Sequence, residues 1–435
     1  MARTDPMGVG LKVLNRLAQS SVIDRFGLRD ATQRVVYHGA RNGFKAAGTA
    51  QRTFTKVRSG GQGARPSTSG PNGVFDLTPT DDQQMMVEVV EEFAREVLRP
   101  GAESAEAVND TPKEVLGRTN DFGLSLINIP EDLGGLSQER SAVTGVLVAE
   151  ALASGDMGQA VACLAPSAVA TAIALWGTDG QQQSYLSAFA GDDVPAAALA
   201  VAEPLVLFDP LAPQTTARRA GAGYTVSGLK SGVVRGSEAE LFVVTAEVEG
   251  RGPSMIIVEA SAAGVQVADD PSMGLRAAGL SRLALDGVEV SEDAILGSVE
   301  DCREMVRLSR LAWAGLALGT ARTTLGYVKD YVTTREAFGE PIAHRQAVAF
   351  TVADMAIELE GMRLVTLRAA SRVDQGLDAS REIALARKLT AEYGMKIGTD
   401  GVQMLGGHGF VKEHPVERWY RDLRAIGVME GAVLV

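Results

Sequence analysis

The sequence predicts an α+β protein in which a β domain lies between two helical domains, and three observations support this prediction. The chain has 435 residues, more than one hydrophobic core usually organises, so several packed units are expected. Apolar residues recur at helical spacing over 76–196 and over 301–435, whereas 197–300 contains short β-branched runs separated by Gly, Pro and Asp. The order helices, strands, helices indicates a separate central β domain rather than an alternating parallel sheet.

The N-terminal helical domain, 76–196, opens on a clear helix start. In the stretch TDDQQMMVEVVEEFAREVL, Thr80 is placed to cap a helix and Gln83 stands at its third position, the pattern of a capping box. The apolar stripe of this helix consists of Met86, Val89, Val90, Phe93 and Val97.

The central domain, 197–300, is predicted to be an antiparallel sheet or a small barrel. Its strands are expected in GYTVSGLKSGVV, ELFVVTAEV, SMIIVEA, GVQVAD and SRLALDGVEV. The C-terminal helical bundle, 301–435, is predicted to contain long helices over 308–334, 346–375 and 380–405.

A basic extension, 1–58, precedes these domains. It carries eleven Lys and Arg against three Asp, although the whole chain has a formal net charge of −12. Apolar spacing within 8–57 predicts two amphipathic helices, and the Gly/Ser/Pro-rich stretch 59–75 is expected to be a linker. Peripheral membrane contact and wrapping of an acidic neighbouring subunit are equally good interpretations of the basic helices.

Composition excludes several classes of function. The acidic balance argues against nucleic-acid binding, which needs a basic face. Cys163 and Cys302 are far apart, so neither a disulfide framework nor a zinc site is expected, and a reducing compartment is favoured. The four histidines lack ligand spacing, no stretch reaches about 18 uninterrupted apolar residues, and the start lacks the apolar core of a signal peptide. We expect a cytoplasmic protein without a metal, with peripheral membrane contact through 1–58 as an option.

Three motifs in the C-terminal third resemble successive signatures of the acyl-CoA dehydrogenase family. They are RLSRLAWAGLALGTARTTLGYVKDYVTTREAFGEPIAHRQAVAF, VQMLGGHGF and HPVERWYRDLRAIGVMEGA, and the likeness covers 76–435. The resemblance implies the family's fold and its reaction, in which a carboxylate removes a proton from Cα of an acyl-CoA thioester while the Cβ hydride passes to N5 of FAD. It also implies FAD as cofactor, a tetramer of identical or homologous subunits, and an electron acceptor such as electron-transfer flavoprotein.

The resemblance assigns the catalytic roles to two residues. Glu430, in MEGA, matches the family's base, and Arg310 matches an arginine near that base. The alternative for each is an ordinary surface charge. MEGA lacks the threonine that usually follows in the family, and the final family helix does not follow it within this sequence.

The resemblance also assigns FAD contacts that reach across a subunit interface to the cofactor of a neighbour. An arginine suits this role because its guanidinium is always charged and can fork onto pyrophosphate, and bare glycine backbone lets the chain approach a cofactor closely. The alternative for LGGHG is a helix end followed by a turn. The six matching positions are Arg335, Phe338, Gln346, Gln403, Gly406 and Gly407.

The half of the FAD site that belongs to the β domain departs from the family pattern. In AVAEPLVLFDPLAPQT the family's Thr-Glu-Pro-Gly-x-Gly-Ser-Asp is retained only at Glu203, Pro204 and Asp209. LKSGVVRGS departs from the family's Lys-x-Trp-Ile-Thr-Asn in the same way. These changes remove hydroxyls and glycines and add bulk where a pyrophosphate must lie. The changed positions are Ala202, Leu205, Leu207, Phe208, Gly232 and Val234.

Three hypotheses follow from this mixture. In the favoured one, the chain is an FAD-poor subunit of a hetero-oligomeric acyl-CoA dehydrogenase and lends its cross-interface contacts to FAD on a homologous partner. In the second, it is a self-sufficient homotetrameric flavoenzyme, which accounts for Glu430 but not for the altered β domain. In the third, it is a noncatalytic scaffold that docks at a membrane through 1–58.

Overall fold

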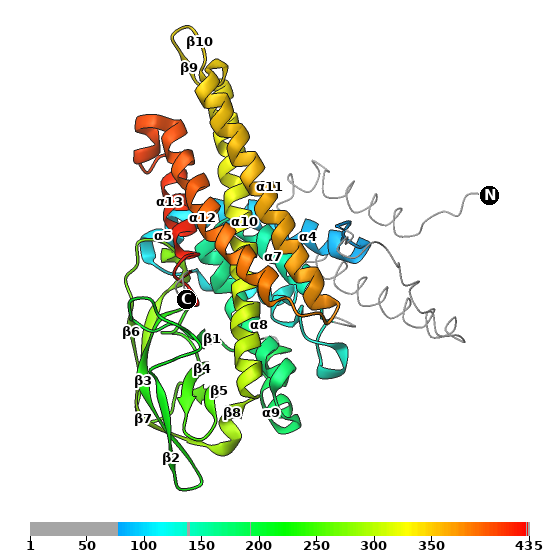
Figure 1. The fold of residues 1–435 in the computed structure, drawn as a ribbon, viewed down its shortest axis with the longest axis vertical. Coiled ribbons are helices and arrows are strands. Elements are labelled where there is room, and N and C mark those ends of the chain that lie inside the picture. Colours follow the sequence, from blue (N-terminus) through cyan, green and yellow to red (C-terminus); the bar gives the residue numbers. More distant parts are fainter. Residues whose placement is uncertain (1–76, 137–139, 192, 432, 434–435) are drawn as a thin grey trace, which may run out of the picture. The chain divides into compact units, whose positions relative to one another are not determined.

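A computed structural model describes residues 77–136, 140–191, 193–431 and 433 (Figure 1). The chain divides into two compact units, Met1–Val74 and Phe75–Val435, and every described residue belongs to the second. The basic extension 1–58 and the linker 59–75, with the functions predicted for them, lie outside the described residues.

The N-terminal helical domain begins as its capping box predicts. The Thr80 hydroxyl accepts from the backbone N–H of Gln83, and the Gln83 side chain accepts from the backbone N–H of Thr80. A π-helical turn, Ala94–Leu98, joins the first two α-helices. The helices are α4 (Asp81–Phe93), α5 (Arg99–Val108), α6 (Lys113–Asp121), α7 (Ala142–Ala153), α8 (Met157–Trp176) and α9 (Asp179–Phe189).

Helix α8 is long and apolar enough to cross a membrane, which the sequence did not lead us to expect. Of its most apolar window, 72% is buried inside the protein, where it packs against the neighbouring helices and the sheet. Buried core helices pass the same test of length and composition as membrane spans. The apolar character of α8 therefore reflects its place in the core.

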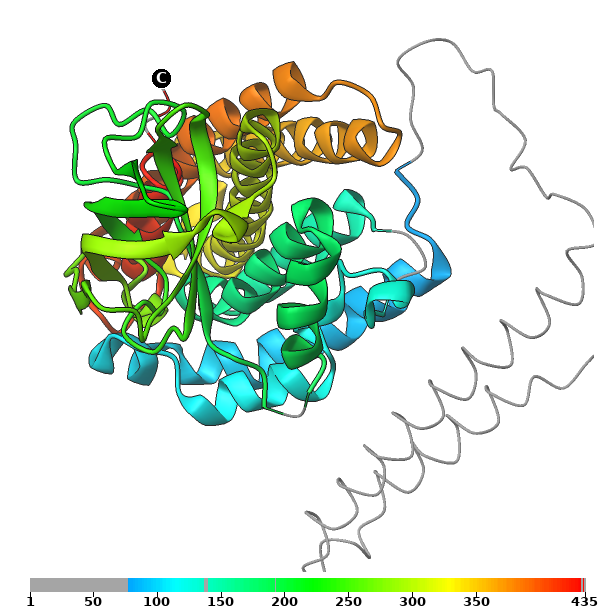
Figure 2. The same cartoon turned by 90° about the horizontal axis from the view of Figure 1, so that it is seen from below.

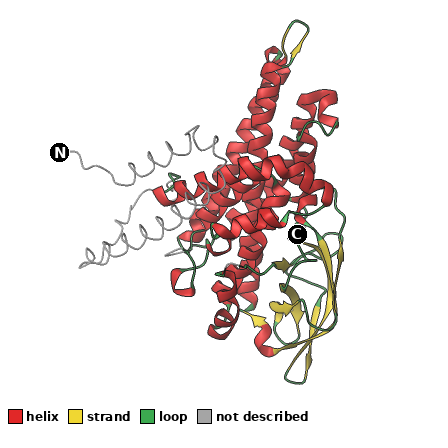
Figure 3. Ribbon diagram, turned by 180° about the vertical axis from the view of Figure 1, so that it is seen from behind, coloured by secondary structure: helices red, strands yellow, loops and turns green. Residues whose placement is uncertain are grey.

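The central domain is an eight-stranded sheet in the order β6-β7-β3-β2-β4-β5-β8, with β1 paired to β4. Most pairs are antiparallel as predicted, but β1 and β2 both run parallel to β4. The sheet gathers on one side of the helices, as Figures 2 and 3 show. The strands are β1 (Ala197–Ala200), β2 (Thr216–Ala220), β3 (Gly223–Val233), β4 (Leu241–Val248), β5 (Gly252–Glu259), β6 (Val265–Asp269), β7 (Ser281–Ser291) and β8 (Ile295–Leu296).

The C-terminal domain consists of long helices that pack on one another. Helix α10 (Val299–Thr334) begins nine residues before the predicted start at 308, because Ser298 caps it in a capping box with Asp301. A two-stranded hairpin, β9 (Glu336–Ala337) and β10 (Glu340–Pro341), joins it to α11 (Gln346–Asp374). Helices α12 (Ser380–Leu405) and α13 (Val416–Ala425) follow. The fold is the predicted one.

Helix α13 meets the other two domains through buried charges. Arg421 donates to Glu106 on α5 at 2.5 Å and to the carbonyl of Met273 at 2.8 Å. The carboxylate of Asp422 accepts from the backbone N–H of Leu275 at 2.7 Å. Burial raises the pKa of Asp422 to about 7, and the neighbouring buried Asp156 adds to this effect. The carboxyl of Asp422 is therefore held protonated well above its ordinary pKa.

This arrangement predicts a stability that falls as pH rises. The unfolded carboxyl ionises near 3.8, so between that value and about 7 the folded chain retains a proton that the unfolded chain has released. We expect Asp422→Asn, which keeps an oxygen acceptor for Leu275, to raise the thermal unfolding midpoint above wild type at pH 8. The advantage should shrink as the pH is lowered to 4, and Asp330→Asn on the exposed side of α10 is the control. A gap between the two proteins that is constant over this range would contradict the prediction.

Candidate active site

Glu430 lies in the turn that follows α13 and packs against the start of α10. Its Oε1 accepts from the Ser309 hydroxyl at 3.0 Å and from Trp313 Nε1 at 3.3 Å. The residue is 8% exposed, and its Oε2 is buried without a hydrogen-bond partner among the described residues. One carboxylate oxygen is thus held by neutral donors, and the other is free to accept a proton.

Arg310 also lies at Glu430, as predicted, but it contacts the backbone. Its Nε and Nη2 donate to the Glu430 carbonyl at 3.2 and 3.0 Å, and burial lowers its pKa. Sequence reasoning missed Ser309, Trp313 and Arg387, which also contact this turn. Ser309 and Trp313 are one helical turn apart beside Arg310, so the spacing i, i+4 could have indicated them. Nothing in the sequence marked Arg387.

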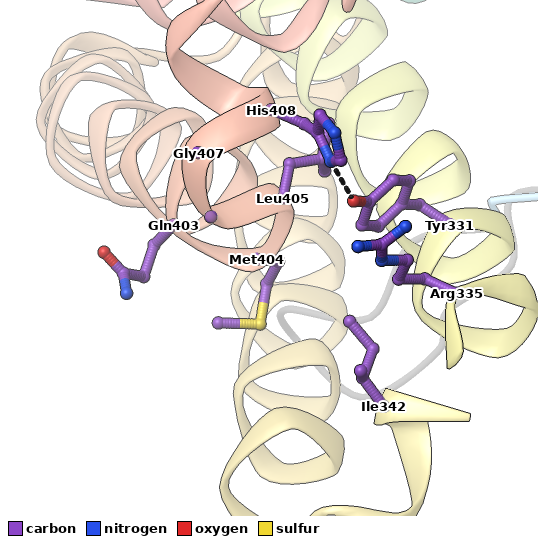
Figure 4. A pocket seen from close by; sticks show the side chains of 9 residues that line it. Tyr331, Arg335, Ile342, Gln403, Met404, Leu405, Gly407 and His408 are labelled. Atoms are coloured by element: carbon purple, nitrogen blue, oxygen red, sulfur yellow. Dashed lines mark hydrogen bonds between the residues drawn. The ribbon is translucent and has the colours of Figure 1, made fainter. Parts of the chain in front are cut away.

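A pocket of about 320 Å³ lies at the C-terminal end of α10 (Figure 4). We call it the Arg335 pocket. It brings together four of the six residues that the sequence predicts to contact FAD. Tyr331 and His408 form one wall, where the Tyr331 hydroxyl and His408 Nδ1 are 2.8 Å apart. The lining residues are Tyr331, Arg335, Ile342, Gln403, Met404, Leu405, Gly406, Gly407 and His408.

The shape of this pocket depends on the glycines that end α12. Gly406 has φ +58, a left-handed conformation that favours glycine, and a Cβ at Gly406 or Gly407 would meet no atom within 4 Å. The backbone is therefore open here, next to the Arg335 guanidinium. An anionic group fits this surface, because a planar cation and bare backbone are typical of phosphate sites.

Phe338 and Gln346, the other two predicted FAD contacts, do not line the pocket. Phe338 sits in the β9–β10 turn with φ +57 and is 94% exposed, and the Arg345 guanidinium lies 5.5 Å from the centre of its ring. Gln346 is the exposed first residue of α11. Their roles as FAD contacts stay predictions.

The loop after β1 carries the altered FAD motif. Val206 is 94% exposed and its neighbours Leu205 and Leu207 are also exposed. Leu207 has φ +54, so a branched side chain occupies a conformation that favours glycine. Phe208 turns inward instead, is buried, and has Lys230 Nζ 6.0 Å from its ring centre. The loop tip therefore presents leucine and valine side chains to solvent.

The second altered motif, around Gly232, lies against Met429 from the C-terminal domain. Gly232 has φ +62, and a Cβ there would lie 3.5 Å from the sulfur of Met429. On the other side of the same turn, a Cβ at Gly431 would lie 2.6 Å from Pro210 and 2.9 Å from the Phe208 carbonyl. The two altered motifs thus contact the Glu430 turn directly.

The base of the altered loop keeps a buried ion pair. Lys230 is fully buried, and its ammonium donates to Glu203 at 2.8 Å, to the Thr245 hydroxyl at 3.1 Å and to the Val201 carbonyl at 3.2 Å. Burial lowers the pKa of Lys230 to about 8, and Glu203 opposes this shift. Burial alone would raise the pKa of Glu203, but Lys230 and Thr215 bring it below its usual value.

Removing one partner of this pair should be costly. Lys230→Met leaves a buried carboxylate without its cation, and losses of about 3–5 kcal/mol are typical of such changes. We expect a lower denaturation midpoint for Lys230→Met and partial recovery in the double variant Glu203→Gln, Lys230→Met, measured by urea unfolding. Equal midpoints for the single and double variants would contradict this account.

Comparison with known proteins gives the chain its family. Profiles of the N-terminal, middle and C-terminal domains of acyl-CoA dehydrogenases match residues 80–193, 198–288 and 301–433. An acyl-CoA dehydrogenase of Bacillus subtilis is 30% identical over 362 residues, which cover 81% of this chain and 95% of that protein. The chain therefore belongs to the acyl-CoA dehydrogenase family, a family of FAD-dependent oxidoreductases.

Solved structures agree with this assignment. Butyryl-CoA dehydrogenase from Megasphaera elsdenii has a TM-score of 0.77 and 25% identity, covering 83% of this chain and 97% of its own. The same fold occurs in a glutaryl-CoA dehydrogenase from Mycobacterium smegmatis in complex with FADH2, with a TM-score of 0.75, 22% identity, and coverage of 82% and 92%. FAD is thus the cofactor found on this fold.

Proposed function

We propose that this chain is one subunit of an acyl-CoA dehydrogenase and that it lends the Arg335 pocket to FAD carried by a homologous partner. The distance between two predicted site residues supports this proposal. Arg310 lies in α10 and Arg335 directly follows the last residue of that helix, 25 residues further along, which at 1.5 Å per residue is about 38 Å. The Arg335 pocket therefore lies far from this chain's own Glu430, which supports a contact to FAD held by another subunit of the assembly.

The chemistry of the pocket supports the proposal. When bound, FAD supplies the acceptor for the hydride that leaves the acyl chain. In this chain Arg335 would donate to phosphate oxygens, Gln403 would hydrogen-bond through its amide, and Gly406 and Gly407 would let the backbone approach. The substrate would be an acyl-CoA thioester, and electron-transfer flavoprotein would be the acceptor, as is typical of the family.

The flavin half of the site is what this chain lacks. Exposed Leu205 and Leu207 replace glycines of the family motif, and buried Phe208 replaces its serine. Gly232 stands where the family has a tryptophan, and Met429 lies against it. Each lost hydrogen bond to a charged group is worth about 1.5–3 kcal/mol, so several losses together can abolish binding. A subunit of this kind would retain the Arg335 pocket, which contacts a partner's FAD, and would lose the β-domain contacts to an FAD of its own.

Glu430 favours a second candidate, a self-sufficient homotetrameric enzyme. Its buried Oε2 is free to accept a proton, as a base requires, and Arg310 holds its backbone. The two candidates differ in one measurable quantity, the flavin bound by the chain when it is purified alone.

We therefore predict the flavin content of two preparations. The chain alone should show no visible flavin absorption, and its complex with a homologous acyl-CoA dehydrogenase chain of intact motif should hold about one FAD per two subunits. Turnover is measured with butyryl-CoA or palmitoyl-CoA and a dye as electron acceptor. It should be absent in the chain alone and present in the complex that holds FAD. One FAD per chain and turnover from the chain alone would establish the second candidate instead.

Arg335→Ala tests the pocket itself. Loss of a charge-assisted contact to phosphate should weaken FAD retention in the complex by about 10-fold or more, because such hydrogen bonds contribute about 1.5–3 kcal/mol. Arg381→Ala, which removes an exposed arginine from α12, is the matched control and should retain FAD. Unaltered FAD affinity in Arg335→Ala would refute the cross-subunit contact.

A further inference from the structure

Guanidinium groups from two helices hold the turn that carries Glu430. Arg310 on α10 donates to the carbonyl of Glu430. Arg387 on α12 donates through Nη2 to the carbonyl of Met429 at 2.5 Å and to the carbonyl of Gly431. Three successive carbonyls are therefore tied down, the middle one from α10 and the outer two from α12.

The backbone of this turn needs such support. Glu430 has φ +58 and Gly431 has φ +92, so two consecutive residues adopt left-handed conformations. This conformation costs a non-glycine residue about 1–2 kcal/mol. Charge-assisted hydrogen bonds to the carbonyls on both sides offset that cost and fix the direction in which the Glu430 side chain leaves the backbone.

The two cations do not bind the carboxylate itself. A carboxylate near a guanidinium ordinarily forms a paired, bidentate contact. Here the hydrogen bonds of Arg310 and Arg387 go to backbone carbonyls, while Glu430 Oε1 is held by Ser309 and Trp313. The tied backbone therefore keeps the carboxylate from rotating onto either arginine, and Oε2 stays free.

Burial of Arg387 at this position lowers the stability of the fold. It is buried, and its Nε and Nη1 have no hydrogen-bond partner among the described residues. Burial and the neighbouring Arg310 lower its pKa to about 10. Unpaired buried donors are destabilising, so a hydrophobic side chain would suit a purely structural position better.

We propose that Arg387 is a positioning residue, which holds the backbone from Met429 to Gly431 so that Glu430 presents an unpaired Oε2. The inference concerns how Glu430 is held and is independent of which subunit carries the flavin. Flavin content tests the proposed function, and the measurement below tests Arg387.

Trp313 provides the signal for this test, because its indole N–H donates to Glu430 Oε1. Tryptophan emission of the full chain is measured with and without Glu430→Gln, in the wild-type background and in Arg387→Met, Arg387→Lys and Lys388→Met. We expect the emission change caused by Glu430→Gln to fall about threefold or more in Arg387→Met, because the two side chains are no longer held together. Arg387→Lys should restore most of it, since an ammonium can still donate to both carbonyls.

Lys388→Met, the same kind of change on the exposed neighbour, should leave the emission change at its wild-type size. If Arg387→Met lowers the melting temperature but leaves the emission change intact, Arg387 is merely structural and the proposal fails. If Arg387→Met does not fold, Arg387→Gln takes its place in the cycle. An undiminished emission change in Arg387→Gln would overturn the proposal equally.

Discussion

The rigid length of α10 is the constraint on which the rest of the structure depends. Its first turns pack against the β domain through Met305 and Val306, and its middle packs against the N-terminal helices and α12. Because α10 is one rigid helix that packs against elements of all three domains, the residues near its start and those near its end are held at a fixed separation. The Glu430 turn and the Arg335 pocket are therefore two separate places on one chain.

The sequence predicted those parts that local chemistry determines. The capping box at Thr80, the change from helical to strand spacing near 197, and the end of α12 at Leu405 all follow from nearby residues. Apolar spacing predicts the start of α10 too late, because the first turns of this helix are charged. The capping residue Ser298 is the signal that marks the true start. The two parallel pairings to β4 depend on contacts between distant residues, which no local pattern encodes.

The candidate site divides in the same way. Family motifs located Arg335, Gln403, Gly406 and Gly407, and the fold brings these four together. Motifs could not locate Arg387, because it reaches the Glu430 turn from a helix about 40 residues earlier, and its hydrogen bonds are made to carbonyls. A side chain that recognises backbone has no partner whose identity can be read from a sequence.

The changes in the loop after β1 leave intact the buried ion pair that supports it. Glu203 and Lys230 form this pair, and loss of either partner would leave an uncompensated buried charge. That pair and its hydrogen bonds to Thr215 and Thr245 are intact. The exposed part of the loop carries Leu205, Val206 and Leu207, whereas Phe208 turns inward. The loop thus combines a retained buried support with an altered surface, and this combination is the reason why the proposed function assigns the flavin to a partner subunit.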